Sequence, residues 1–477
     1  MSAVNVVVRW GREKFELEVH TSEPTELFKG QLFALTGVPI ERQKIMIQGK
    51  TVQDSWDNIK LNPGAMMMMM GSADPVPQAP TKDTPLAMDT DAPKELYLPV
   101  GLENCGNSCY MAAVFQTLHT CPEFQEALTA YKLPSGSLDD PKDGLIYALR
   151  AAFKKIGRAD VGFLPTELLL DKVQLCFPDF AEKLPNGMNQ QQDANECFTG
   201  VMRTSFDTLA RQEACKPKGS NAAIGKFFTG NYEITYKNTE NPDEQPEVIH
   251  EDFLQLSCYL SQEVRYLSTG LSQNLNQEVV KFSRSLDRDA KYQSQTLIDR
   301  LPAYLSIQIV RFFFKESTKT YQKILKDVQF PFKLDLHHLC TARLQELMKP
   351  HREEFKKQDD AKLEYDSQHK MAVDSNEKAH PGEALPFSFE NDPGSNNSAY
   401  YELQAVITHK GRAANSGHYV AWIRLEEEKW VKCDDDEVTP VHIDEVKKLS
   451  GGGDWHTAYV LLYGPKICRK FDHLIKK

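Results

Sequence analysis

A cysteine stands where a polar turn gives way to an apolar helical pattern, in the stretch Gly101-Leu-Glu-Asn-Cys-Gly-Asn-Ser-Cys-Tyr-Met111. The glycines, asparagines and serine before Cys109 are turn and cap residues, while Met111, Phe115 and Leu118 share one helical face. We therefore expect Cys109 at a helix N-terminus, where unpaired N–H groups and the helix dipole stabilise a thiolate. The thiolate is the nucleophilic form, so Cys109 is a candidate nucleophile. The alternative is one more buried cysteine.

Two further residue types complete the chemistry that a cysteine nucleophile needs. Asn104, five residues before Cys109, offers a side-chain amide that can donate a hydrogen bond to an oxyanion. His418 follows the glycine-flanked segment 411–417, expected to be a flexible loop, and opens a predicted strand, a placement that suits a general base. Most isolated histidines are structural, so this interpretation depends on a partner acid.

That acid is expected in the next strand, which ends in Trp430-Val-Lys-Cys-Asp-Asp-Asp436. The two-residue period of a strand places Asp434 and Asp436 on one face and Asp435 on the other. A carboxylate on the face of His418 would orient the imidazole, as in a catalytic triad.

The spacing of these motifs resembles the boxes of the ubiquitin-specific proteases. Gly-Leu-x-Asn-x-Gly-Asn-x-Cys-Tyr-Met resembles the cysteine box, Gln190-Gln-Gln-Asp193 a second box, and Gly-His-Tyr-Val with Trp-x-Lys-x-Asp-Asp the histidine box. The resemblance implies the following roles: Cys109 as nucleophile, His418 as general base and acid, Asp434 as orienting acid, Asn104 at the oxyanion, and Gln192, Asp193, Gly417 and Tyr419 in substrate binding.

Three details qualify this resemblance. The family usually carries asparagine where this chain has Ala112, which affects a supporting contact rather than the nucleophile. His409 also matches a family position, but there it is not the base. The polar run from Gln190 to Glu196 would by default be a solvated first turn of a helix over 189–209, and we favour the alternative that it faces the active-site cleft.

The chain divides into three parts by composition. Residues 1–73 combine an alternating hairpin, a helix opened at Ser22-Glu-Pro24 and further strands, an order that resembles a ubiquitin-like β-grasp domain. Residues 74–96 are rich in proline and are expected to be a flexible linker. Residues 97–472 match the family's catalytic domain.

Within this third part, helices are expected at 109–119, 123–132, 143–156 and 165–177, in addition to 189–209, before the pattern becomes strand-like. The strands of 226–300 resemble the family's fingers, which in many members are held by two zinc-binding Cys-x-x-Cys pairs. Only Cys258 is in place here, so we expect no metal and no cofactor. Residues 341–386 are highly charged, which predicts one helix followed by a partly disordered insertion.

Composition limits the function class. The chain has 477 residues, a formal net charge of −11 and ordinary hydrophobic and charged fractions of 41% and 26%. The acidic balance argues against a nucleic-acid partner, and no apolar run predicts a transmembrane segment. Its ten cysteines include no Cys-x-x-Cys pair, which favours a reducing location, cytoplasmic and possibly also nuclear.

We therefore expect an α+β protein with a papain-like catalytic domain of thumb, palm and fingers behind a ubiquitin-like domain. The implied function is a cysteine-type deubiquitinase that acts on ubiquitin and ubiquitinated proteins, is monomeric when free, and docks on the proteasome regulatory particle through its first domain. An inactive ubiquitin-binding scaffold is the alternative from another class. An unrelated papain-type protease is a third, which would leave the first domain and the glutamine-rich box unexplained.

Overall fold

A computed structural model describes residues 98–470, apart from 158–161, 274, 316–319, 370–381, 414–415 and 454. Before residue 71 it describes residues 3–10, 13–21, 25, 28–29, 32, 38, 43–47, 50–52, 56 and 64–70. The chain separates into two compact units, Met1–Lys94 and Glu95–Lys477, and each is considered by itself. The predicted linker 74–96 lies outside the described residues.

The first unit is a five-stranded sheet with the order β2-β1-β5-β3-β4. The strands are β1 (Ala3–Trp10), β2 (Glu13–His20), β3 (Lys44–Ile47), β4 (Lys50–Thr51) and β5 (Ala65–Met70), and only β1 and β5 pair in parallel. Their alternating valine, isoleucine and methionine side chains form a small core with the helical residues Phe28 and Leu32. The rest of the helix expected after Ser22 lies outside the described residues.

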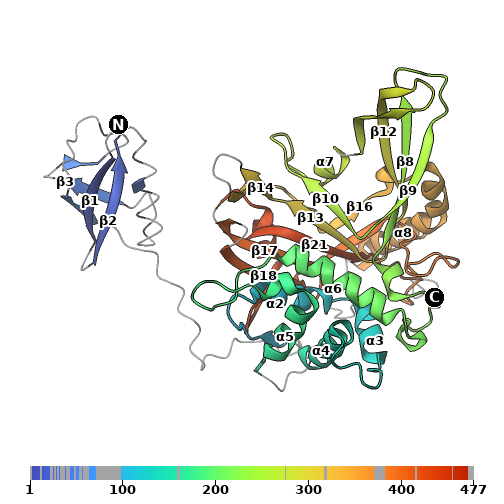
Figure 1. Cartoon of the computed structure of the whole chain (residues 1–477), viewed down its shortest axis with the longest axis horizontal. Coiled ribbons are helices and arrows are strands. Elements are labelled where there is room, and N and C mark those ends of the chain that lie inside the picture. Colours follow the sequence, from blue (N-terminus) through green and yellow to red (C-terminus); the bar gives the residue numbers. More distant parts are fainter. Residues whose placement is uncertain are drawn as a thin grey trace. The chain divides into compact units, whose positions relative to one another are not determined.

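The second unit begins with a helical half (Figure 1). Its helices are α2 (Cys109–Leu118), α3 (Pro122–Ala130), α4 (Pro141–Ile156), α5 (Glu167–Cys176) and α6 (Ala194–Leu209). These match the predicted helices closely, except that α6 begins at Ala194 and not at residue 189, because Asp193 is its N-cap. The polar run before Asp193 is therefore extended chain and not a first helical turn.

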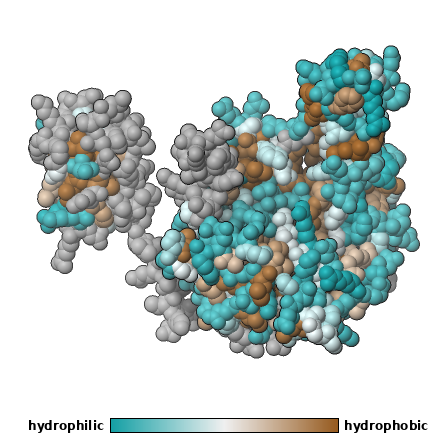
Figure 2. All heavy atoms as spheres, viewed as in Figure 1, coloured by the Kyte–Doolittle hydropathy of each residue, from teal (hydrophilic) through white to brown (hydrophobic). Residues whose placement is uncertain are grey.

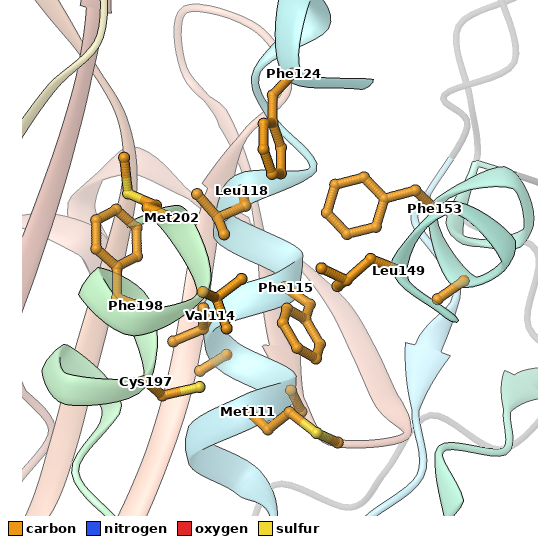
Figure 3. Packing of buried hydrophobic residues seen from close by; sticks show 14 of the residues in the cluster. Met111, Val114, Phe115, Leu118, Phe124, Leu149, Phe153, Cys197, Phe198 and Met202 are labelled. Atoms are coloured by element: carbon orange, nitrogen blue, oxygen red, sulfur yellow. The ribbon is translucent and has the colours of Figure 1, made fainter. Parts of the chain in front are cut away.

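Helix α2 is the centre of this half, and all ten of its residues are buried. Figure 3 shows it between α4 and α6, with Phe115 directed toward Leu149 and Phe153, and Val114 beside Phe198. A further side of α2 packs on the strand that carries His418. Surrounded in this way, the helix that bears Cys109 has little freedom to shift.

A ten-stranded sheet forms the other half, with the main order β10-β13-β21-β17-β18-β19-β20. These strands are β10 (Gln255–Tyr259), β13 (Leu305–Val310), β17 (Tyr400–Ala413), β18 (Ser416–Arg424), β19 (Lys429–Asp434), β20 (Glu437–His442) and β21 (Thr457–Pro465). Short strands β14 (Phe312–Lys315), β15 (Thr320–Lys323) and β16 (Lys333–Asp335) extend the sheet beside β17. Apolar side chains on its two faces belong to two separate cores, so the sheet is covered on both sides.

A four-stranded antiparallel sheet, with the order β11-β12-β8-β9, projects from the body in Figure 1. It consists of β8 (Gly230–Asn238), β9 (Glu247–Phe253), β11 (Asn276–Ser283) and β12 (Arg288–Arg300). At its tip, Glu244 accepts hydrogen bonds from Asn238 Nδ2 at 2.8 Å, Ser283 Oγ at 2.8 Å and Tyr292 OH at 2.6 Å. A carboxylate thus joins loops and strands at the tip. Cys258 lies elsewhere, buried on β10 in the core below.

The remaining elements connect these parts. They are β6 (Gly101–Leu102), β7 (Phe163–Leu164), α7 (Leu267–Ser272), α8 (Ala342–His369), α9 (Ile443–Lys447), and the 3-10 turns η2 (Pro178–Ala181), η3 (Glu213–Cys215), η4 (Ile224–Phe227), η5 (His337–Leu339) and η6 (Lys448–Ser450). The helix expected at the start of the insertion is α8, which is anchored in the core by Leu344, Met348 and Phe355. The insertion's residues 370–381 lie outside the described residues. No helix in the described part of the chain is long and apolar enough to cross a membrane.

Candidate active site

Cys109 is the first residue of α2 and only 2% exposed. The loop before it is shaped by Asn104, whose Oδ1 accepts hydrogen bonds from the backbone N–H of Gly106 at 3.0 Å and of Ser108 at 3.2 Å. Gly106 and Asn107 both adopt the left-handed conformation, with φ of 86° and 55°, which explains why glycine and asparagine stand there. The predicted placement of Cys109 at a helix N-terminus is therefore what the structure has.

The loop is also attached to the segment before α6. Asn107 Nδ2 donates to the carbonyl of Asn189 at 2.8 Å, and Asn189 Nδ2 donates to the carbonyl of Gly106 at 3.1 Å. The segment is therefore held beside the thiol. Gln191 Nε2 lies 3.4 Å from Cys109 Sγ, and the backbone N–H of Tyr419 points to the same sulfur at 3.5 Å.

Sequence reasoning missed Gln191, whose side chain is only 7% exposed. It selected the neighbouring Gln192 for substrate binding. In extended chain alternate residues face the same way, so Gln191 and Asp193 face inward together. Gln192 points elsewhere, with its amide on the carbonyl of Asp179 at 3.3 Å. Asp193 is a typical helix N-cap residue, so the residues before it could have been predicted as extended chain. That prediction would have placed Gln191 on the same side as Asp193.

Asp193 has three hydrogen-bond partners. Its Oδ1 accepts from the backbone N–H of Asn195 at 2.7 Å and of Glu196 at 3.0 Å, and its Oδ2 accepts from Tyr459 OH at 2.7 Å. Burial raises the pKa of this carboxyl, and the hydrogen bonds act against that rise. Asp193 therefore joins the start of α6 to strand β21 of the sheet, next to the thiol.

His418 lies near the start of β18 with its Nε2 2.5 Å from Asp434 Oδ1 at the end of β19. The hydrogen bond to Asp434, followed by one to Cys109, raises the pKa of His418 from 6.5 to about 10. The same bond to His418 lowers the pKa of Asp434 well below its usual range. The second oxygen of Asp434 accepts from Lys432 Nζ at 2.5 Å. The three expected triad residues are together, and the imidazole is held as a cation beside the sulfur.

The prediction that Asp435 lies on the opposite face from Asp434, made from the two-residue period of a strand, was wrong. Strand β19 ends at Asp434, and Asp435 turns with φ of 55°, so that Asp434 pairs with Glu437 across a two-residue connection. Asp435 therefore lies within 4.8 Å of His418 and Asp434 and not on the opposite face. Its Oδ2 accepts from Asn104 Nδ2 at 2.7 Å, which joins the cysteine loop to this turn.

Backbone contacts strengthen that connection. The N–H of Leu102 donates to the carbonyl of Asp435 at 2.8 Å. A Cβ on Gly101 would lie only 2.2 Å from the carbonyl oxygen of Asp436, so any side chain there would collide with the turn. Glycine at position 101 permits this close approach.

The segment 411–417 is not the open loop that its glycines suggested. Its described residues continue β17 and β18 as a hairpin that bulges between Lys410 and Ala413, and 414–415 lie outside the described residues. Gly417, with φ of 139°, packs so tightly that a Cβ would lie 2.4 Å from His409 Nε2. The described residues of the expected loop, 411–413 and 416–417, are therefore strand residues, which corrects the expectation of a loop there.

Aromatic side chains pack against one another around Tyr419, whose backbone N–H points to the sulfur. Phe312 contacts His409 and Tyr459 edge-on, both at 5.3 Å between ring centroids, and Tyr419 lies 4.8 Å from His409. Burial lowers the pKa of His409 to about 3, so this second histidine stays neutral and is not suited to act as a base. The ten cysteines are all free thiols, including half-buried Cys105, whose sulfur lies 3.3 Å from Thr166 Oγ1.

Comparison with known proteins agrees with this geometry. The family model described as ubiquitin carboxyl-terminal hydrolase matches residues 100–463. Ubiquitin carboxyl-terminal hydrolase 14 of Caenorhabditis elegans is 40% identical over 98% of this chain and 95% of its own length. Ubiquitin carboxyl-terminal hydrolase 6 of Arabidopsis thaliana is 36% identical over 96% and 98%, and the protein of that name in Schizosaccharomyces pombe is 31% identical over 97% and 99%. The chain therefore belongs to the ubiquitin carboxyl-terminal hydrolase family, the thiol-dependent deubiquitinating enzymes.

Proposed function

We propose that Cys109, His418 and Asp434 hydrolyse the isopeptide or peptide bond at the C-terminal glycine of ubiquitin. The observation that supports these roles best is the position of the three side chains. The N-terminus of α2, the start of β18 and the end of β19 bring them together. All three residues are present, so an inactive scaffold is not favoured.

The chemistry depends on the hydrogen bond between Cys109 and His418, through which His418 takes the proton of the thiol. The thiolate of Cys109 attacks the carbonyl carbon of the terminal glycine, and the oxyanion accepts hydrogen bonds from the backbone N–H of Cys109 and from Asn104. His418 then donates its proton to the leaving amine, which departs and leaves a thioester. A water molecule, deprotonated by His418, attacks the thioester, and Cys109 departs as the thiolate beside the protonated His418, which restores the starting state. Asp434 keeps the imidazole oriented throughout.

The tail of ubiquitin is proposed to enter between the helical half and the sheet. Gly417 and Tyr419, on either side of the base in sequence, and Gln192 and Asp193, before α6, are assigned to binding the tail. Asp193 acts through Tyr459, which it holds, since its own oxygens have protein partners. Glycines without side chains fit a narrow passage, and bulkier termini are excluded.

In family terms the helical half is the thumb, the large sheet the palm and the four-stranded sheet the fingers. One face of the fingers is solvated and carries Val248, Val280 and Phe282, which are 50%, 67% and 55% exposed. The strand register places Val248 of β9 and Val280 of β11 on that same face. Figure 2 shows such hydrophobic residues on the projecting sheet amid a hydrophilic surface. This face is proposed to grip the body of ubiquitin.

The first unit is proposed to be a ubiquitin-like domain that docks on the proteasome regulatory particle, in the cytoplasm and also in the nucleus, with the free chain a monomer. Its strand order, with a parallel central pair, supports the β-grasp assignment. Its docking face is proposed to be the side of β5 that exposes Met66, Met68 and Met70, at 58%, 53% and 44%. Flexible methionines suit a binding surface.

One experiment tests the catalytic proposal directly. Ubiquitin that carries a C-terminal electrophile is expected to form a covalent adduct, and peptide mass spectrometry should place it on Cys109. Turnover of a fluorogenic ubiquitin C-terminal substrate, with and without purified proteasome, tests the docking role. An unlabelled wild-type chain, free and proteasome-bound, would refute the proposed function.

A further inference from the structure

We propose that Lys432 is a positioning residue of this active site, one that holds the free oxygen of Asp434 and so fixes the carboxylate that orients His418. The proposal rests on the function proposed above and adds a residue to it. Lys432 and Asp434 lie two positions apart on β19, so their side chains leave the same face of the strand. Lys432 Nζ lies 2.5 Å from Asp434 Oδ2, while His418 Nε2 lies 2.5 Å from Oδ1. The carboxylate is thus held at both ends by cations.

The carboxylate needs such a second anchor. Asp434 is the last residue of β19, and the left-handed Asp435 turns the chain immediately after it. Its side chain is 24% exposed, so an oxygen without a partner could rotate toward water. Lys432 Nζ is the partner that the structure gives Oδ2, and its side chain, 27% exposed, is itself half-buried. An ion pair of this kind between partly enclosed groups fixes geometry more than an exposed pair does.

Lys432 could instead act only as a competitor, a second cation that shares the negative charge of Asp434 with His418. Removal of such a competitor would raise the pKa of His418 further. Removal of a positioning group lets the carboxylate turn away, which lowers the pKa of His418. Because the hydrogen bond to Asp434 is the largest cause of the raised pKa of His418, we expect the loss of alignment to outweigh the loss of repulsion.

Other titratable groups lie close to His418 and Asp434, and their protonation could affect the measured pKa of His418. Cys109 faces His418 from α2, Lys410 approaches from β17, and Asp435, Asp436 and Glu437 come from the turn into β20. Two further histidines lie close, but burial lowers the pKa of His409 to about 3 and of His456 to about 4. Both histidines stay neutral above pH 6, so neither titrates in the pH range where the His418 imidazole loses its proton.

The test compares Lys432→Met, Lys432→Arg and a control, Lys429→Met, in the full chain. Lys429 lies on the same strand but pairs with Glu426 in the exposed i, i+3 arrangement, so its loss should change nothing. Two properties are measured: the turnover of the fluorogenic ubiquitin substrate, as kcat and KM, and the pKa of the His418 imidazole from an NMR titration, which needs no ubiquitin.

In Lys432→Met we expect kcat to fall about ten- to a hundredfold with KM unchanged, as for a misplaced catalytic group. The pKa of His418 should fall, and Lys432→Arg should restore both kcat and this pKa. A rise in the pKa of His418, or an unchanged kcat, would overturn the proposal. Wild-type turnover is measured alongside, so failure of the proposed function would be seen separately as a wild-type chain without activity.

A double-mutant cycle gives an independent check. If Lys432 acts through Asp434, then Lys432→Met added to Asp434→Asn should cause no further loss of kcat. An additive loss would mean that Lys432 acts elsewhere and would contradict the proposal. Lys432→Gln, which keeps a polar side chain, replaces the methionine variant in every comparison if thermal unfolding shows that the latter does not fold.

Discussion

Two adjacent carboxylates illustrate how single residues acquire different roles in this site. The hydrogen bond from His418 lowers the pKa of Asp434, whereas burial raises the pKa of Asp435, its neighbour. One carboxylate faces a cation and the other faces the amide of Asn104. A sequence of three consecutive aspartates cannot show this division, because it depends on where the strand stops and the left-handed turn begins.

Replacing Asp434 tests the raised pKa of His418. In the wild type, the stabilisation from the charged imidazole is complete below the unfolded pKa of 6.5 and is lost as pH rises through about 10. Asp434→Asn removes the main cause of the shift, so the imidazolium should be lost at lower pH. We expect kcat to fall on the order of a hundredfold or more, and an NMR titration should show that the His418 imidazole loses its proton at lower pH. A midpoint at the wild-type value would contradict the assignment of Asp434.

The two cysteines of the cysteine loop provide a matched pair. Cys109→Ala should abolish turnover but leave ubiquitin binding intact, because it removes only the sulfur atom from a buried helix that already contains Ala112 and Ala113. Cys105→Ala should retain most of the activity, since the Cys105 sulfur contacts Thr166 rather than the triad. Mass spectrometry of the electrophile adduct, together with binding measured by calorimetry, decides between them. An adduct on Cys105 would reverse the assignment.

At the scale of elements, the sequence predicts those helices and strands whose formation depends on neighbouring residues. The helix that starts at Cys109 and the strands that carry His418 and Asp434 could be located from caps and alternation, since each follows from residues within one turn or strand. Gln191 could not, because its contact with the thiol depends on Asn107 and Asn189 tying two distant loops together. The strand pairing of the described residues 411–413 and 416–417 was obscured by Gly411 and Gly417, which allow close packing on His409.

The approach of β6 to the turn after Asp434 gives a prediction at this scale. Gly101→Ala would force a Cβ against the carbonyl of Asp436, so we expect a loss of about 1–3 kcal/mol in unfolding free energy, as for other overpacked sites. Activity should fall as well, because Asn104 follows on the same segment. Gly453→Ala is the matched control, since nothing lies within 4 Å of its Cβ position. Equal thermal unfolding curves for both variants would contradict the close contact.

At the scale of the whole molecule, the two units each have their own core. All the proposed catalytic residues lie in the second unit, Glu95–Lys477. We therefore propose that the second unit carries out the chemistry and that the first unit docks on the partner. A tether between them would raise the local concentration of the enzyme wherever the first unit binds.

A chain that starts at residue 95 tests this division. It should fold, react with the ubiquitin electrophile and keep the basal turnover rate of the isolated full chain, yet lose most of its co-sedimentation with proteasomes. The full chain with Met66→Ser, Met68→Ser and Met70→Ser serves as the companion variant and should lose co-sedimentation alone. Loss of labelling in the shortened chain would mean that the first unit is part of the enzyme. Undiminished co-sedimentation would place docking in the second unit.

The contact between Leu102 and Asp435 has a consequence for biosynthesis. The two residues are hydrogen-bonded to each other although more than 300 positions separate them along the chain. Ribosomes deliver the N-terminal part first, at about 5–20 residues per second. The nascent chain therefore carries its nucleophile for some time before the strands that supply His418 and Asp434 emerge. A prematurely terminated chain that lacks those strands would be unable to cleave ubiquitin conjugates, including those formed on the nascent chain itself.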